Sequence, residues 1–293
     1  MNRKRKSSSE EIQLHGPNDL SRVFFVDGTV RRDFNFWTPT IHALLRHLER
    51  VGFDGAPRVI GIDESRREML SFIDGAVPEW PRRPWNFRSG RALTEVAQLI
   101  RGFHDASVSF EAPIDAKWRG LVGAPTSGDV ICHNDLGPFN VVFKRGRPIA
   151  IIDWDNASPG SRMCDVACAL WRFTPLWGSD AWWGGDWEGN GWKLSLDTKA
   201  TRMQQFRSAY GAGLFPDWTR VLDLIEARMR ASELTVNARA VAGSPFYEKF
   251  RRSGTFALPD LAWLRHNRVA LKGLLEEHRS HERRSAATLK LKS

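Results

Sequence analysis

Residues 130–155 bring together side chains whose oxygen atoms suit magnesium binding and proton transfer. Asp135 is followed at five residues by Asn140, and Asp153 ends the apolar run that comes next. Transfer of a phosphoryl group from a nucleoside triphosphate needs a carboxylate that orients or deprotonates the attacking hydroxyl, and hard oxygen ligands that hold Mg²⁺ against the phosphates. The pattern predicts this chemistry, with Asp135 facing the acceptor and Asn140 and Asp153 facing the metal.

A strand and a hairpin are expected to bring these three side chains together at one edge of the strand pair. The chain favours a short apolar strand and then a hairpin, over residues 130–133, 140–144 and 149–153. A turn through Gly137-Pro138 sends the chain back, and the hairpin returns Asp153 beside Asn140. An ordinary hairpin with polar ends is the alternative, but it gives no reason for two acids and an amide to converge.

A family resemblance rests on the motifs H-N-D-L-G-P-F-N, I-I-D-W-D and C-D-V-A, which begin at His133, Ile151 and Cys164. They resemble the aminoglycoside phosphotransferase and choline kinase family, whose catalytic loop shares the Asp-to-Asn spacing of protein kinases. The resemblance covers about residues 12–280. It implies an ATP- or GTP-dependent, Mg²⁺-dependent kinase that phosphorylates a hydroxyl of a small molecule such as an aminoglycoside, choline or a sugar.

Carried over by motif, the resemblance makes Asp135 the catalytic base and Asn140 and Asp153 the Mg²⁺ ligands. His133 is the catalytic-loop histidine, chiefly structural in the family, and Asp165 braces the loop. The fold implied is α+β and two-lobed, protein-kinase-like, with a small antiparallel β lobe and a larger, mainly helical lobe.

Nucleotide contacts are expected in the small lobe. An apolar strand ending in Asp74-Gly75 resembles the family's hinge, where backbone groups of Ser71, Phe72 and Ile73 would bind adenine; a plain edge strand is the alternative. The usual phosphate-binding lysine of the third strand is missing, and only Arg31 and Arg32 are offered there. Arginine can clamp phosphate bidentately with permanent charge.

Periodicity and turn signals divide the chain into a basic tail (1–11), a nucleotide-binding lobe (12–75), a catalytic and acceptor lobe (76–280) and a second basic tail (281–293). Strands are predicted over residues 12–14, 22–26, 29–32, 57–62 and 67–73. Helices are predicted over residues 39–51, 90–104, 163–173, 197–209, 218–236 and 261–278. A Trp-rich stretch, 175–192, could line an acceptor pocket or simply pack.

Composition limits the remaining possibilities. A hydrophobic content of 42% with 26% charged residues is typical of a globular protein, and no apolar run is long enough to cross a bilayer. Three cysteines fit a reducing compartment, so a cytoplasmic location is expected. A net charge of +9 keeps open a basic nucleic-acid-binding protein, and the missing lysine keeps open a nucleotide-binding or scaffolding pseudokinase.

Overall fold

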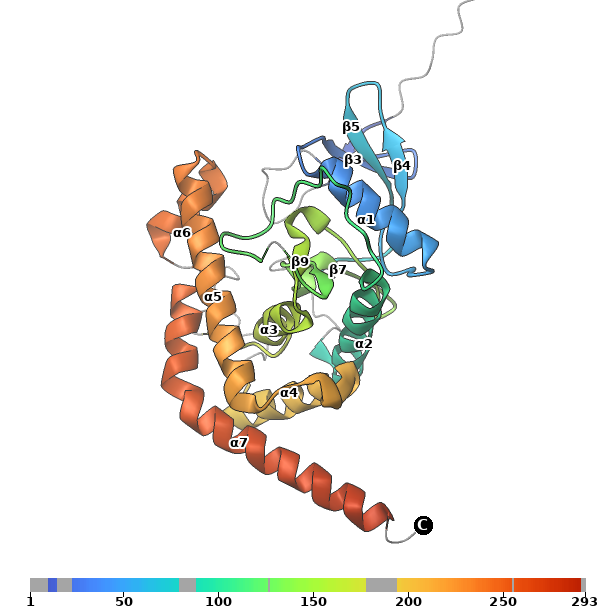
Figure 1. Cartoon of the computed structure of the whole chain (residues 1–293). Coiled ribbons are helices and arrows are strands. Elements are labelled where there is room, and N and C mark those ends of the chain that lie inside the picture. The colour runs from blue at the N-terminus through green and yellow to red at the C-terminus, as the bar shows by residue number, and fades with distance from the viewer. Residues whose placement is uncertain are drawn as a thin grey trace, which may run out of the picture.

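The computed structural model describes residues 10–14, 23–78, 88–125, 127–177, 194–254 and 256–290. A small sheet with one covering helix comes first in the chain, and a larger, mainly helical part follows (Figure 1). This arrangement confirms the predicted fold class, because the strands of the first part are antiparallel and helices dominate the second.

The sheet holds five strands in the order β1-β2-β3-β5-β4, and all neighbouring pairs are antiparallel. Its strands are β1 (Ile12–Gln13), β2 (Phe24–Val26), β3 (Thr29–Asp33), β4 (Val59–Ile62) and β5 (Arg67–Ser71). Asp27 and Gly28 turn β2 into β3 with positive φ angles of 48° and 75°. Such angles are those of a tight hairpin turn, so the Asp-Gly signal set this pairing locally.

Helix α1 (Thr38–Arg50) crosses from β3 to β4 and packs its apolar stripe inward. Pro39 lies in its first turn, where a missing N–H costs nothing. Ile41, Leu44, Leu45 and Leu48 recur at helical spacing and are all fully buried. The helix also contacts α2 (Gly90–Ser107), which joins the sheet to the larger part.

The middle of the chain forms two small antiparallel strand pairs. The first joins β6 (Val130–Cys132) to β9 (Ser158–Gly160), and the second joins β7 (Val141–Lys144) to β8 (Arg147–Ile151). Helix α3 (Arg162–Phe173) follows β9. The N–H of Ile151 donates to Gly55 O at 2.9 Å, so the second pair is tied to the segment between α1 and β4.

The remaining helices lie along the left side and the bottom of the molecule in the view of Figure 1. They are α4 (Leu196–Gly211), α5 (Trp218–Val241), α6 (Pro245–Ser253) and α7 (Leu258–Lys290). Helix α4 packs on α2, and α5 packs on α3, so the strand pairs and the C-terminal helices share one continuous apolar core. Within the described residues, no helix combines the length and the apolarity that a membrane span requires.

The element predictions hold for most of the chain and fail at three places. Strand β9 was not predicted, because its three residues pair only with the distant β6 and carry no alternating pattern. Helix α6 was not predicted either, although Ser244-Pro245 opens it and Gly254, with a φ of 59°, closes it. Helix α7 runs on through Lys290 instead of ending near residue 278.

Candidate active site

Asp165 anchors the loop that follows β6. It lies in the first turn of α3, is fully buried, and accepts the backbone N–H groups of His133 (2.5 Å) and Asn134 (2.8 Å). His104 Nε2 pairs with the same carboxylate at 3.2 Å, and His104 Nδ1 meets the Tyr210 hydroxyl at 2.7 Å. Burial alone would raise the pKa of Asp165, but the His104 contact and the N–H donors lower it, so the carboxylate stays ionised.

Both ring nitrogens of His133 are hydrogen-bonded within the loop that follows β6 or to the segment after β8. Its Nε2–H donates to Ile152 O at 2.9 Å, since a carbonyl can only accept, and Nδ1 therefore accepts from the backbone N–H of Asp135 at 3.2 Å. Both ring nitrogens are thus used by main-chain groups of the loop and of the segment after β8. This geometry gives His133 a positioning role beside Asp135.

Asn140 joins the two ends of the loop. Its Nδ2 donates to Asp135 O (2.9 Å) and to Asp135 Oδ2 (3.2 Å), while its main-chain oxygen accepts from Ile152 N at 2.9 Å. These bonds place Asn140 between Asp135 and the residue before Asp153. The amide nitrogen is taken, so Oδ1 is the atom of this side chain that suits a cation.

Asp153 leaves β8 with a left-handed backbone, φ 60° and ψ 66°. The next residue, Trp154, is 1% exposed, donates to Ile151 O at 3.0 Å, and stacks edge-on against Phe103 and His133. Packing of Trp154 therefore holds the strained turn and directs Asp153 outward. Desolvation, and then the nearby Asp155, raise the pKa of Asp153, although 48% of its side chain is exposed.

Arg32 of β3 connects the sheet to these carboxylates. Its Nη1 lies 3.4 Å from Asp153 Oδ1, its Nη2 lies 2.8 Å from Asp155 Oδ1, and its Nε pairs with Glu68 of β5. Burial opposes the positive charge, but Asp155 and Glu68 more than offset this and raise the pKa of Arg32. One permanent cation therefore links the small sheet to the segment after β8.

Glu68 of β5 lies opposite Arg32 on the neighbouring strand and pairs with it. It is 2% exposed, and its second oxygen meets His42 Nε2 of α1 at 2.9 Å. Strand alternation separates the two candidate arginines: Arg32 shares this cluster, whereas Arg31 turns to Asp63 at 3.5 Å. The structure thus brings Arg32 to the site and leaves Arg31 on the other face of β3.

The predicted hinge lies at the end of β5. The N–H of Ser71 donates to Arg58 O at 2.8 Å, and the N–H of Phe72 donates to Gly28 O at 3.2 Å. Both donors are therefore used within the sheet. No backbone partner of the Ile73 N–H occurs in the described part of the chain.

The donor set at Asn140 and Asp153 fits Mg²⁺. Carboxylate and amide oxygens are hard ligands, and Asp153 is accessible, which a cation held jointly with phosphates requires. No group of three or more His, Cys, Asp or Glu residues able to hold a metal occurs among the described residues. A cation held by one or two protein oxygens and completed by phosphates and water is the usual magnesium arrangement in phosphoryl-transfer sites.

Some positioning residues were not predicted from the sequence. Glu68 lies outside the motifs, and Asn134 lies within H-N-D-L-G-P-F-N but was given no role of its own. Arg228 lies on a helix nearly a hundred residues away, and its Nη2 donates to Asn134 O. Asn134 has a positive φ of 64° and donates to Asn156 O (3.0 Å) and Ser158 Oγ (2.8 Å). The buried Trp154 could have been recognised, because it separates two acids at the end of an apolar strand. The Trp-rich stretch lies mostly outside the described residues.

A small antiparallel sheet, a helical second part and a catalytic-type loop beside the segment of the arginine-paired Asp153 together define the phosphotransferase fold of the protein-kinase-like class. Comparison with solved structures agrees. A choline/ethanolamine kinase family protein of Mesorhizobium loti has a TM-score of 0.57 at 14% identity, covering 92% of both chains. A candidate aminoglycoside phosphotransferase of Ralstonia eutropha has a TM-score of 0.56 at 14% identity, covering 90% of this chain and 94% of that one.

Sequence comparison identifies the family. The model of the phosphotransferase enzyme family matches residues 114–224. The trifolitoxin immunity protein of Rhizobium leguminosarum bv. trifolii is 31% identical over 276 residues, which span 91% of this chain and 99% of that protein. The chain belongs to the phosphotransferase enzyme family.

Proposed function

We propose that this protein transfers the γ-phosphoryl group of ATP or GTP, with Mg²⁺, to a hydroxyl of a small molecule. The observation that carries the proposal is the link from Arg32 to Asp153 and Asp155, beside a loop in which Asn140 contacts Asp135. A purely structural hairpin would not need a half-buried cation to hold two acids at its end.

In this reaction the acceptor hydroxyl attacks the γ-phosphorus, the bond to the leaving nucleoside diphosphate breaks, and the hydroxyl proton passes to Asp135. Asn140 holds the Asp135 carboxylate through Oδ2, which leaves Oδ1 to face the acceptor. Magnesium, when bound, would supply charge neutralisation on the phosphates, with Asp153 and Asn140 as its protein ligands. Arg32 keeps Asp153 in place from the sheet side.

The charges around the loop favour a neutral or anionic acceptor over a polycation. Arg239 of α5 donates to Gly120 O, Asn156 Oδ1 and the Tyr247 hydroxyl, which are all neutral acceptors. Arg228 donates to the carbonyl of Asn134. Arg228 and Arg239 both interact electrostatically with Asp135. A polycationic aminoglycoside would meet this positive charge unfavourably.

The name of the curated relative suggests a biological setting. That protein is called a trifolitoxin immunity protein, so a phosphotransferase of this kind could protect a cell by modifying a toxin. A toxin hydroxyl therefore joins sugars and amino alcohols among the acceptors that we propose to test.

An acceptor screen tests the proposal. The full chain is incubated with Mg-ATP or Mg-GTP and a panel of alcohols that includes choline, sugars, macrolides, aminoglycosides and trifolitoxin, and a gain of one phosphate is followed by mass spectrometry. Asp135→Asn should slow turnover by about a thousandfold while nucleotide binding stays near that of the wild type. Asp153→Ala should weaken Mg-nucleotide binding itself.

Asp129→Asn is the matched control, because Asp129 is exposed and directly precedes β6. A wild-type rate in Asp135→Asn would refute the base assignment. Nucleotide binding that depends on Asp153, with no acceptor phosphorylated, would instead favour a nucleotide-binding scaffold.

A further inference from the structure

Arg119 is an accessible cation beside the acids that follow β8. Its Nη1 lies 3.7 Å from Asp155 Oδ2, beyond hydrogen-bonding distance, and the other oxygen of Asp155 is held by Arg32 at 2.8 Å. None of the Arg119 nitrogens donates a hydrogen bond to the described residues, none is fully enclosed, and 26% of the side chain is exposed. A guanidinium carries five donors, so this group can bind a further anion.

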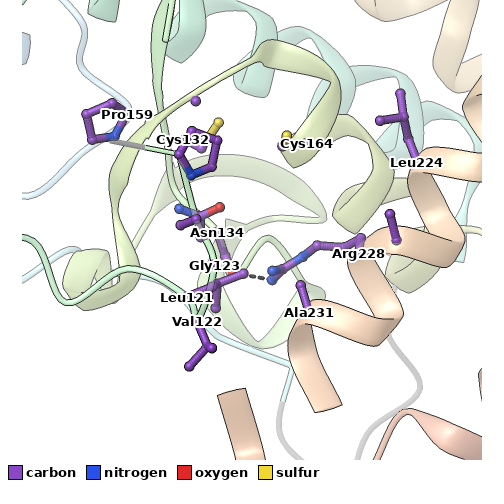
Figure 2. Close-up of a pocket in the computed structure, with 14 residues that line it drawn as sticks. Leu121, Val122, Gly123, Cys132, Asn134, Pro159, Cys164, Leu224, Arg228 and Ala231 are labelled. Atoms are coloured by element: carbon purple, nitrogen blue, oxygen red, sulfur yellow. Dashed lines mark hydrogen bonds between the residues drawn. The ribbon is translucent and has the colours of Figure 1, made fainter. Parts of the chain in front are cut away.

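The segment that carries Arg119 is anchored on both sides. The N–H of Lys117 donates to Thr40 Oγ1 of α1 at 2.8 Å, and the N–H of Val122 donates to Thr235 Oγ1 of α5 at 3.0 Å. Figure 2 shows Val122 among the residues that line a pocket of about 160 Å³ against α5. The backbone around Arg119 is therefore held by both parts of the molecule.

An aromatic ring supports the Arg119 side chain. The guanidinium carbon lies over Trp37, at the start of α1, 5.0 Å from the ring centroid. Arginine forms such contacts with aromatic faces and can still offer its N–H edge to a planar carboxylate, with two parallel hydrogen bonds. Trp37 thus positions the cation without using its donors.

A second arginine adds positive charge from α5. All printed hydrogen bonds of Arg239 go to neutral acceptors, one of them Asn156 Oδ1 at 2.9 Å. Burial lowers the pKa of Arg239, Arg119 lowers it further, and Asp135 opposes the fall. Arg239 therefore interacts electrostatically with both Arg119 and the proposed base, so an anion beside Asp135 would meet two guanidinium groups.

The two sides of Asp155 separate the phosphates from the acceptor. Arg32 contacts Asp153, the proposed magnesium ligand, and Asp155 Oδ1, whereas Arg119 approaches Asp155 Oδ2. We therefore expect the phosphates on the Arg32 side and the acceptor on the Arg119 side.

We propose, resting on the phosphotransferase function above, that Arg119 binds a carboxylate of the acceptor and that the substrate is a small hydroxy acid. In the transfer, the hydroxyl oxygen bonds to the γ-phosphorus, the bond from phosphorus to the nucleoside diphosphate breaks, and Asp135 takes the hydroxyl proton. The carboxylate stays unchanged in its pair with Arg119. A neutral alcohol of the same shape would lack this charge-assisted contact, and a cationic alcohol would be repelled.

Isothermal titration of the full chain with magnesium and a non-hydrolysable ATP analogue measures acceptor binding. The probes are 3-hydroxypropionate, 4-hydroxybutyrate and 5-hydroxypentanoate, each compared with its primary amide, which has the same shape without the charge. At least one acid should bind at one site, at least about tenfold more tightly than its amide. With Mg-ATP, the same acid should gain one phosphate by mass spectrometry, and faster than its amide.

Variants of the segment identify the cation. Arg119→Met keeps an apolar stem over Trp37 and should remove the preference for acid over amide, while Mg-ATP and Mg-ADP bind as in the wild type. Arg119→Lys keeps the charge without the paired donors and should weaken acid binding less than Arg119→Met does. Lys117→Met is the matched control, since Lys117 is an exposed cation of the same segment, and it should bind the acids as the wild type does.

Equal binding of every acid and its amide, no binding of any of them, or an unchanged preference in Arg119→Met would each overturn the proposal. A loss of affinity for Mg-ATP but not for Mg-ADP in Arg119→Met would assign Arg119 to the γ-phosphate and overturn it too. If choline or another alcohol is phosphorylated and none of the acids is, the acceptor assignment fails and the phosphotransferase function stands. If the acids bind as expected but no alcohol is phosphorylated, the phosphotransferase function itself fails, and the acceptor role with it.

Discussion

Replacing Asp165 by asparagine is the sharpest test of how the catalytic loop is held. The carboxylate uses Oδ1 for Asn134 N–H and Oδ2 for both His133 N–H and His104 Nε2. Asparagine has one oxygen and one NH₂ group, so at least one of these donors must face another donor. The loop would therefore lose a hydrogen bond that is fully buried.

The size of the effect follows from these contacts. A buried donor left without an acceptor costs about 1–3 kcal/mol, and the remaining bonds lose their charge assistance. We expect the free energy of unfolding of Asp165→Asn to fall by about 3 kcal/mol. This is a large share of the roughly 5–15 kcal/mol that stabilises a typical domain.

Urea unfolding followed by tryptophan fluorescence measures this loss, because Trp154 and Trp171 are buried near the loop and α3. Asp115→Asn is the control, since Asp115 is an exposed aspartate of the loop before β6. It should change the unfolding free energy by less than about 0.5 kcal/mol.

The pH dependence gives a second, independent readout. The pKa of Asp165 is lower in the folded protein than the ordinary value near 4, so its ionisation stabilises the fold above that value and the benefit is lost as pH falls through the folded pKa. The gap between wild type and Asp165→Asn should be constant above about pH 5 and shrink below about pH 4. An unchanged unfolding free energy, or a gap that does not vary with pH, would refute this role for Asp165.

Three further outcomes are expected. Burial lowers the pKa of Lys199 to about 8, so the unfolded chain binds more protons between pH 8 and 10.5 and wild-type stability rises with pH there. Lys199→Met should therefore raise the free energy of unfolding by up to roughly 3 kcal/mol in urea at neutral pH, and loss of the hydrogen bond to Pro175 O should reduce this gain. The gain should vanish above pH 10.5, where Lys199 is neutral in both the folded and the unfolded chain. Arg32→Lys should weaken Mg-nucleotide binding about tenfold in a fluorescent-nucleotide titration, because one ammonium cannot replace three nitrogens; unchanged affinity would count against the network. Trp171→Phe should cost about 2 kcal/mol by thermal unfolding, since buried Asp260 loses a donor at 2.8 Å, and a wild-type melting temperature would contradict this.

Local signals in the sequence were enough for most elements. The Asp27-Gly28 turn, the apolar stripe of α1 and the N-cap of α2 at Ser89 depend on neighbours within a few residues. Such features are set by backbone conformation and by helical periodicity, which the sequence displays directly. Strand β9 lacks them, because it exists only through pairing with β6.

Some residues of the candidate site were predicted from the sequence, and others were identified only from the folded structure. Spacing along the chain predicted Asp135, Asn140 and Asp153, and the structure brings Asn140 into contact with Asp135 and with Ile152, the residue before Asp153. Spacing could not choose between Arg31 and Arg32. That choice depends on which face of β3 looks toward Asp153, and it became visible only when β3 was paired with β5.

The sequence by itself determined the catalytic-type loop, the hairpin and the succession of a small β part and a helical part, since each is encoded within short segments. Tertiary structure decided which distant groups complete the site. Glu68 meets Arg32 across a strand pair, Arg228 reaches the loop from α5, and His104 meets Asp165 from α2. These contacts arise because burial of polar groups demands partners, and only the folded chain selects which partners are near.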